Sequence, residues 1–490
     1  MKTLVMGGGF GGIAAALRLR ARGHDVHLID RCTRLGGRAQ VFVHDGYRHD
    51  AGPTVITAPF LFTELFTLFG EELTDHLTLR ELDPWYRFAF PDGTQFDYGP
   101  GIERMEAEIA RFNPNDVKGY HGLLAESKAL FEIGFEQLGD QPFHQASFML
   151  KQIPHLLRLR FNRSVWQMVS SHIEHPYLRR ALSLQPLLVG GNPFDTTCIY
   201  GLIHYLERKW GVHFAMGGTG ALVDALAQLL ERHGVVVENG RSVEAIQRSG
   251  NRIESIVLDD GRQLKADQYI SNMDPMHLYG ELLTPAPTAS RLKQKLSKTS
   301  MGLFVLYFGT DRQYPDVAHH TIWLGERYKE LLHDIFDRKI LTEDFSLYLH
   351  RPTATDPSFA PEGHDSFYVL APVPNLQGNI DWAVEGPRLQ ARIIDALERT
   401  IMPNLSAHVR SDFFMTPEDF RHNYQSVDGS GFSISPLFTQ SAWFRFHNKA
   451  EGLNNLYLVG AGTHPGAGMP GVLSSAKVLD RIIPAATEIA

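Results

Sequence analysis

The stretch from Thr3 to Asp30 constrains the fold more than any other part of the chain. A short apolar run, Thr3–Met6, is followed by a glycine-rich turn, a helical run from Ile13 to Arg22, and a second apolar run that ends on Asp30. A strand, a tight turn, a helix and a return strand form a βαβ unit with parallel strands. The sequence therefore predicts an α/β fold with a Rossmann-like sheet at the N-terminus.

The turn carries the spacing G-x-G-x-x-G at Gly7, Gly9 and Gly12. The first glycine permits the tight turn, the second lets the backbone approach a pyrophosphate, and the third lets helix and strand pack closely. Phosphates then lie on the free N–H groups of the helix N-terminus. Asp30 falls where a carboxylate accepts hydrogen bonds from a ribose hydroxyl, which argues against a 2′-phosphate. We predict a dinucleotide site at this turn.

A second glycine pair, Gly36-Gly37, is followed by Arg38. Its backbone N–H groups and the arginine suit a second phosphate region, because both attract anionic oxygens. A nicotinamide dehydrogenase has no need of this element, so it favours an extended cofactor such as FAD. The alternative is a surface turn with a solvated arginine.

Composition limits the other classes of function. The net charge is −8 and the pI about 6.3, which gives no indication of nucleic-acid binding. Two cysteines, Cys32 and Cys198, are too few for a disulfide framework, so we expect a reducing, cytoplasmic setting. The 23 histidines are scattered, and the one adjacent pair, His319-His320, lacks partners at ligand spacing. We therefore expect no metal site.

Two observations bear on membranes. The chain shows no secretory signal and no apolar run long enough for a spanning helix. Residues 141–173 contain no Asp or Glu, and apolar residues there alternate with four cations: Lys151, Arg158, Arg160 and Arg163. This pattern fits contact with an anionic membrane surface or a buried helix pair with basic edges. Pro154 should kink or break a helix here.

Strand patterns follow in the remaining chain. Trp85–Tyr98 and Ile253–Leu264 read as hairpins, the second turning on Asp259-Asp260-Gly261. Further strand-like runs are Leu303–Phe308, Phe345–Leu349 and Phe367–Leu370, and an alternating segment, Val41–His49, should be a strand as well. Their β-branched and aromatic content predicts a mostly antiparallel sheet separate from the Rossmann part.

Near the C-terminus, an apolar strand, Leu456–Val459, runs into a glycine-rich loop and then into a helix of small residues. The loop contains Gly460, Gly462 and Gly471, and Val472 follows it. A helix N-terminus behind such a loop suits a pyrophosphate or the electron-rich edge of a reduced flavin. We predict that both ends of the chain meet around one cofactor.

Several of these motifs together resemble the bacterial phytoene desaturases of the carotenoid and retinoid oxidoreductase family. The resemblance runs nearly end to end, and the C-terminal motif is its most specific part. Gly8 and Met469 depart from the family pattern without weakening the assignment. The motifs that carry the resemblance are Gly7-x-Gly9-x-x-Gly12, Gly36-Gly37-Arg38, Asp50–Thr57, Leu187–Phe194, Gly217–Val223 and Val459–Gly468.

The resemblance implies an amine-oxidase-like architecture, in which a discontinuous FAD-binding domain is joined to a mixed-sheet substrate domain and a helical, membrane-associated region. It places the turn at Asp50–Thr54 near the flavin ring and the backbone of Val243 on the adenine. The expected domains are residues 1–75, 212–275 and 450–490 for FAD, 76–140 and 276–449 for substrate, and 141–211 for the helical region.

The implied activity is the desaturation of phytoene, a C40 isoprenoid taken from the membrane, to lycopene. An allylic hydride passes to flavin N5 and a vicinal proton is lost, in repeated rounds, with oxygen or a quinone as final electron acceptor. His464, in the loop expected beside the flavin, is the candidate proton acceptor, although it could equally fix that loop. The expected location is the inner face of the cell membrane.

Other activities share parts of this pattern. Another carotenoid desaturase or a carotenoid isomerase would use the same flavin site. A flavin amine oxidase shares the cofactor motifs but acts on polar substrates. A non-catalytic prenyl-binding protein shares the architecture, and the intact set from Gly7 to Arg38 argues against it.

Overall fold

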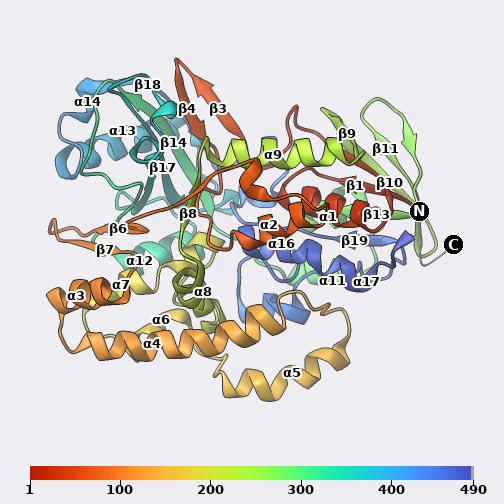
Figure 1. The fold of residues 1–490 in the computed structure, drawn as a ribbon, viewed down its shortest axis with the longest axis horizontal. Coiled ribbons are helices and arrows are strands. Elements are labelled where there is room, and N and C mark those ends of the chain that lie inside the picture. The colour runs from red at the N-terminus through yellow and green to blue at the C-terminus, as the bar shows by residue number, and fades with distance from the viewer. Residues whose placement is uncertain (487–490) are drawn as a thin grey trace.

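The computed structural model describes residues 1–486, except the side chains of residues 155–158. The end of the expected 450–490 segment and the side chain of Arg158 therefore lie outside the described residues. Figure 1 shows the five-stranded sheet and its helices on one side, the large antiparallel sheet on the other, and a layer of helices beneath both.

The first sheet is parallel throughout and confirms the predicted Rossmann-like unit. Its strand order is β19-β13-β1-β2-β9, so the two ends of the chain and its middle lie in one sheet. The strands are β1 (Lys2–Met6), β2 (Asp25–Asp30), β9 (Val236–Asn239), β13 (Gln268–Ser271) and β19 (Leu456–Leu458).

Helix α1 (Phe10–Ala21) is buried on nearly all sides, which explains its alanines and its lack of a polar face. It packs between α16 (Met469–Lys477) and α9 (Gly218–Arg232) (Figure 1). Helices α2 (Phe60–Thr67) and α17 (Leu479–Ile482) complete this layer. The C-terminal helix thus lies directly on the N-terminal one.

A small antiparallel sheet extends the nucleotide-binding part. It consists of β10 (Val243–Ser249), β11 (Arg252–Leu258) and β12 (Gln263–Leu264). The hairpin predicted at 253–264 is confirmed, with Gly261 at a positive φ of 82° in its turn.

The large sheet has seven strands in the order β18-β14-β17-β16-β15-β6-β7, and all its pairs are antiparallel except β15 with β6. The predicted mostly antiparallel sheet is therefore confirmed. Its strands are β6 (Tyr86–Ala89), β7 (Gln95–Tyr98), β14 (Gly302–Thr310), β15 (His320–Trp323), β16 (Leu347–His350), β17 (Asp365–Val373) and β18 (Val409–Met415). Further elements of the chain are β5 (Leu79–Glu81), β8 (His213–Ala215), α10 (Pro275–His277), α11 (Thr288–Leu296), α12 (Tyr328–His333), α13 (Trp382–Thr400), α14 (Leu405–His408) and α15 (Pro417–Tyr424).

The prediction of one strand over Val41–His49 was wrong. The segment forms a hairpin, β3 (Val41–His44) and β4 (Tyr47–Asp50). Asp45 and Gly46 both take positive φ angles, 49° and 84°, which is the geometry of the two-residue turn that Asp-Gly favours. The chain reverses there because this dipeptide accepts left-handed backbone.

Helices form the lower layer of the molecule. They are α3 (Ile102–Phe112), α4 (Asp116–Phe131), α5 (Ala146–Arg158), α6 (Val165–Ser170), α7 (Pro176–Leu182) and α8 (Leu202–Trp210). Pro154 lies inside α5, and the helix continues past it, so the predicted break does not occur. Proline removes only one backbone donor from the helix.

The surface of α5 is apolar and basic. Leu150 is 64% exposed and Ile153 40%, and Lys151 is exposed beside them. Arg163 instead forms an ion pair with Glu126. Among residues 1–486, no helix is both long and apolar enough to cross a bilayer. Membrane contact by α5 stays a prediction.

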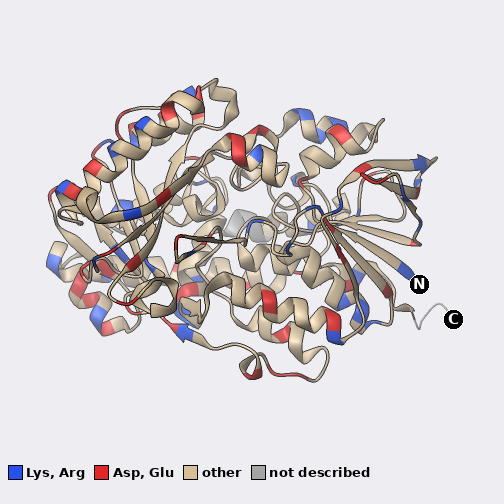
Figure 2. Ribbon diagram, turned by 90° about the horizontal axis from the view of Figure 1, so that it is seen from above, with Lys and Arg blue, Asp and Glu red and all other residues tan. Residues whose placement is uncertain are grey.

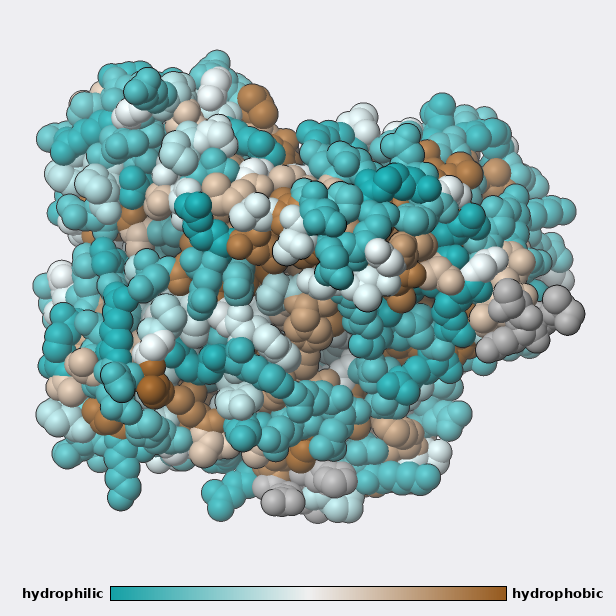
Figure 3. Space-filling view, in the orientation of Figure 1, coloured by the Kyte–Doolittle hydropathy of each residue, from teal (hydrophilic) through white to brown (hydrophobic). Residues whose placement is uncertain are grey.

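Figure 2 shows positive and negative residues interspersed over the outer helices and strands. On the face in Figure 3 most atoms are hydrophilic, and hydrophobic ones gather in the band between the upper and lower parts.

Candidate functional site

The first glycine turn forms a tight cradle between β1 and α1. Gly7 has a φ of +97°, and its N–H donates to the carbonyl of Ile29 (2.8 Å). A Cβ on Gly12 would overlap the carbonyl oxygen of Gly7. Gly9 is the N-cap of α1, so the free N–H groups of the first helical turn face the cavity. The arrangement fits a pyrophosphate.

Asp30 ends β2 at the edge of the same cavity. Its carboxylate accepts hydrogen bonds from the N–H groups of Gly8 (2.5 Å) and Cys32 (2.7 Å). Burial raises the pKa of this carboxyl, and the two N–H donors oppose that rise. The carboxylate therefore both closes the turn and lines the cavity where a ribose would lie.

The second glycine pair lies against the first turn. Gly36 donates to the carbonyl of Gly8 (2.8 Å), and Gly36 and Gly37 have φ angles of +120° and +58°. A Cβ on Gly37 would lie 3.1 Å from Gly9 Cα. Both glycines are required because two backbone segments come together here.

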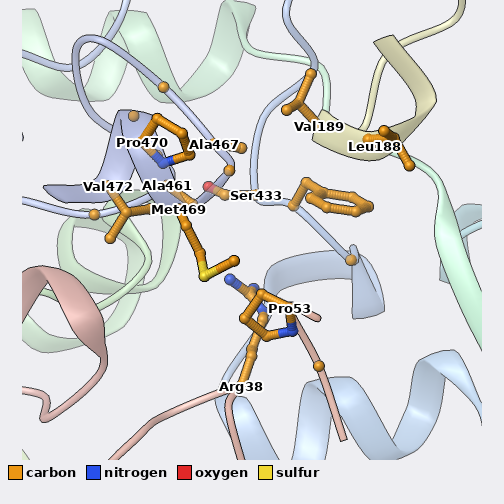
Figure 4. A pocket seen from close by; sticks show the side chains of 18 of the residues that line it. Arg38, Pro53, Leu188, Val189, Ser433, Ala461, Ala467, Met469, Pro470 and Val472 are labelled. Atoms are coloured by element: carbon orange, nitrogen blue, oxygen red, sulfur yellow. The ribbon is translucent and has the colours of Figure 1, made fainter. Parts of the chain in front are cut away.

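Arg38 is not a solvated surface residue. Its Nη2 donates to Ser426 Oγ (2.5 Å), while its buried Nε has no partner among the described residues. Burial lowers the pKa of the guanidinium, and the carboxyl of Asp274 opposes this. Figure 4 shows the side chain extending into the cavity toward Met469, beside Pro53. A buried arginine with an unused donor fits an anionic or carbonyl oxygen of a cofactor.

The middle of the chain supplies two further walls. Val243 opens β10, is 8% exposed and lines the cavity with its neighbours Arg241 and Ser242. Asn272, which the sequence analysis missed, follows β13 and donates its N–H to the carbonyl of Met6 (2.8 Å). The signal for it was a polar residue directly after an apolar strand.

The amide of Asn272 lies between the first and last glycine turns. A Cβ on Gly9 would come within 2.9 Å of its Nδ2, and one on Gly11 or Gly460 within 2.5 Å and 2.6 Å of its Oδ1. The glycines of both ends of the chain are therefore needed for the same reason, to admit this side chain.

The C-terminal loop is held in place by buried polar groups. Gly460 donates to Ser475 Oγ (2.8 Å), and a Cβ on Gly471 would lie 2.6 Å from the carbonyl oxygen of Gly466. A Cβ on Gly462 would overlap Pro275. Val472 lies one turn into α16 and lines the cavity with Pro470 (Figure 4).

Arg445 supports this loop, and no sequence signal pointed to it. The side chain is 1% exposed and donates to the carbonyls of Thr463 (3.0 Å), Ala461 (2.5 Å), Gln440 (3.1 Å) and Ile434 (3.4 Å). Burial lowers the pKa of its guanidinium. Its charge is met entirely by backbone oxygens, so the loop geometry depends on it.

His464 lines the cavity and is 5% exposed. Its ring lies 4.5 Å from that of Phe143, and neither ring nitrogen has a hydrogen-bond partner among the described residues. Burial lowers the pKa of the imidazole to about 3, so it is neutral at physiological pH.

One cavity of about 560 Å³ is lined by most of these groups. Away from the glycine turns its walls are almost wholly apolar and come from the helical layer and the large sheet. The long apolar end fits a ligand without polar groups, because its burial is favourable by roughly 25 cal/mol per Å². Residues of this end include Leu188, Ile203, Leu206, Leu303, Leu331 and Ile335.

Glu207 on α8 is a charged residue in these walls and was not predicted. It is fully buried, lines the cavity, and accepts a hydrogen bond from the hydroxyl of Tyr86 (3.0 Å). Burial raises the pKa of its carboxyl to about 7.

The predicted cofactor residues thus surround one cavity, and each either lines it or lies directly behind a lining residue. Gly12 acts from behind the wall, through its packing on Gly7. The cavity offers two helix N-termini and an arginine with a free donor, and its glycines leave no room for a Cβ. This arrangement suits a dinucleotide with a second ring system, as in FAD.

Comparisons with known proteins support a flavin cofactor and show the family of the chain. The family model for flavin containing amine oxidoreductases matches residues 10–478. The lycopene-forming phytoene desaturase of Pantoea ananas is 48% identical, with 97% of each chain covered. The neurosporene-forming enzyme of Rhodobacter capsulatus is 41% identical over 99% of this chain and 94% of its own.

A solved structure, cyclohexylamine oxidase from Brevibacterium oxydans, superimposes with a TM-score of 0.62, covering 98% of both chains at 15% identity. This likeness supports the amine-oxidase-like fold alone. The chain belongs to the flavin-containing amine oxidoreductase family and, within it, to the bacterial phytoene desaturases.

Proposed function

We propose that the protein is an FAD-dependent desaturase that converts phytoene to lycopene in carotenoid biosynthesis. The observation that carries the proposal is the single cavity, polar and glycine-lined at one end and apolar at the other. Relatives at 48% and 47% identity are lycopene-forming phytoene desaturases. When bound, FAD supplies the redox chemistry by accepting a hydride from the substrate.

The chain's own residues bind and orient the cofactor. The N–H groups around Gly9 and Gly36 would hold the pyrophosphate, Asp30 the ribose, and the backbone of Val243 the adenine. The Arg38 guanidinium and the N-terminus of α16 would lie toward the flavin. We keep the proposed domains at 1–75, 212–275 and 450–490 for FAD, 76–140 and 276–449 for substrate, and 141–211 for membrane contact.

His464 is the proposed proton acceptor. A proton beside an allylic cation is strongly acidic, so an imidazole with a pKa of about 3 suffices as its base. A neutral imidazole carries one N–H, and its other nitrogen, which no described side chain engages, is the one that would accept the proton. The apolar walls exclude water, so few other bases are available there.

The substrate would enter from a bilayer at the exposed apolar and basic face of α5, on the inner side of the cell membrane. Leu150 and Ile153 would contact the lipid and Lys151 its head groups. Electrons would leave to oxygen or a quinone.

The test is to incubate the protein with FAD and phytoene in liposomes and to follow the absorption of the product. The expected result is a coloured conjugated polyene that forms only with FAD. A colourless product with oxygen and with every quinone tried would contradict the proposal. A change of double-bond geometry without new conjugation would instead identify an isomerase.

A further inference from the structure

Three histidines meet in the core, beside the cavity but outside it. His319 directly precedes β15, His320 is its first residue, and His350 ends β16. Antiparallel pairing sets His320 opposite His350, which brings together residues that have no ligand spacing in the sequence. They are 5%, 0% and 0% exposed, and one nitrogen of each lies within 4.8 Å of the other two.

In two of the imidazoles one ring nitrogen is hydrogen-bonded to a hydroxyl group, and the other has no partner among the described residues. His319 Nδ1 lies 2.7 Å from Thr355 Oγ1, and His320 Nδ1 lies 2.8 Å from the hydroxyl of Tyr348. The Nε2 atoms of both are buried without a partner among the described residues. Histidines that bind a metal are typically held in this way by an oxygen on the second nitrogen.

His350 completes the set. Both of its ring nitrogens are buried and unpartnered among the described residues, and Nε2 lies 3.8 Å from Asp50 Oδ2. That carboxylate oxygen also lacks a partner, while Asp50 Oδ1 accepts from the N–H of Thr219 (3.1 Å). Five buried polar atoms of four side chains are therefore unsatisfied in one place, which is costly unless something binds there.

We propose that His319, His320 and His350 hold a zinc-class divalent ion, with Asp50 beside it as orienting partner or fourth ligand. Imidazole is a preferred ligand of Zn²⁺, and three histidines with one oxygen make a tetrahedral set. Nitrogens on a tetrahedral zinc lie about 3.3 Å apart, so small ring rotations close the present arrangement.

The ion would tie three segments together behind the cavity wall. Tyr348, which holds His320, also hydrogen-bonds Thr54 Oγ1 (2.7 Å) on the turn after β4. Asp50 begins that turn. Phe214 packs against the His319 ring at 4.6 Å and supplies an apolar shell. The site is structural, and it supports the turn that lines the cavity.

The experiment measures metal directly and does not depend on activity. Protein expressed in zinc-supplemented medium is dialysed against EDTA, and its metal is counted by mass spectrometry. The expected content is about one zinc per chain. His320→Gln and His350→Gln should lose it, whereas His422→Gln, at an exposed histidine, should retain it. Cobalt introduced on refolding should give the visible absorption of a tetrahedral site.

A milder variant guards against misfolding. Thr355→Val removes the partner of His319 Nδ1 without touching a ligand, and should weaken zinc binding by about 10- to 100-fold in a folded protein. Wild-type protein with no more zinc than His320→Gln, and no cobalt absorption, would overturn the proposal. Ordered water would then satisfy these nitrogens.

Discussion

The carboxyl of Glu207 is buried beside a group of polar side chains, and its pKa is raised. His204 Nε2 donates to the carbonyl of Leu182 (2.6 Å), so His204 Nδ1 accepts from the amide of Gln185 (3.2 Å). Gln185 Oε1 and Glu207 Oε2 are then both buried oxygens without a donor, while Tyr86 donates to Glu207 Oε1 (3.0 Å). Burial raises the pKa of the Glu207 carboxyl to about 7, although the hydrogen bond from Tyr86 and the neighbouring Arg208 and Gln185 oppose the rise.

The sign and size of the effect follow from the raised pKa. The carboxyl ionises near 4.5 in the unfolded chain and near 7 in the folded protein. Between these values the folded state holds more protons, so stability falls as pH rises. The free energy of unfolding is therefore lower by about 3 kcal/mol above about pH 8 than at acidic pH. Glu207→Gln keeps one donor and one acceptor without the charge, and should abolish this loss.

The assay is thermal unfolding of both proteins between pH 5 and pH 9. For a chain of 490 residues, about 3 kcal/mol corresponds to roughly 3 °C in Tm. Glu207→Gln should match the wild type near pH 5 and exceed it by about that much near pH 9. Glu362→Gln, at an exposed carboxylate, is the control and should show no such trend. A Tm difference between the two proteins that is the same at both pH values would refute the raised pKa of the Glu207 carboxyl.

Three further predictions concern the cofactor site. Gly12→Ala, whose Cβ would overlap the Gly7 carbonyl, should abolish flavin retention as measured by absorbance. Gly8→Ala should retain it, because its nearest neighbours are the ends of side chains, Leu35 at 2.3 Å and Asp30 and Leu28 at 3.2 Å, and not backbone. Arg445→Met leaves carbonyls unpaired and should cost at least about 3 kcal/mol, seen as a Tm loss of roughly 3 °C or more; an unchanged Tm would contradict its role. His464→Ala should lower turnover about 100-fold at full flavin occupancy, and unchanged turnover would remove it from the mechanism.

Sequence patterns predicted those parts of the fold that depend on interactions between residues close together in the chain. The βαβ unit, the hairpin at 253–264 and the strand before Gly460 were all confirmed, because glycine spacing and apolar periodicity act within a few residues. Val41–His49 was misread, since alternation outweighed the Asp45-Gly46 turn signal. The cofactor loops were placed by motifs of the same short range.

Long-range contacts were beyond such patterns. Nothing near Arg445 in the sequence indicates that its charge meets four carbonyls in the core. Glu207 reads as an ordinary helix residue until Tyr86 is brought to it from a distant strand. His350 joins His319 and His320 only through strand register.

The strand order of the parallel sheet determines when the N-terminal unit can finish folding during translation. β19, the strand beside β13, is synthesised more than 400 residues after β1, and α1 cannot cover its second side until α16 has left the ribosome. The nascent N-terminal unit therefore exposes an apolar helix for most of translation, and such a surface is prone to aggregation until the rest of the fold covers it. Flavin loading is accordingly a step that follows completion of the chain.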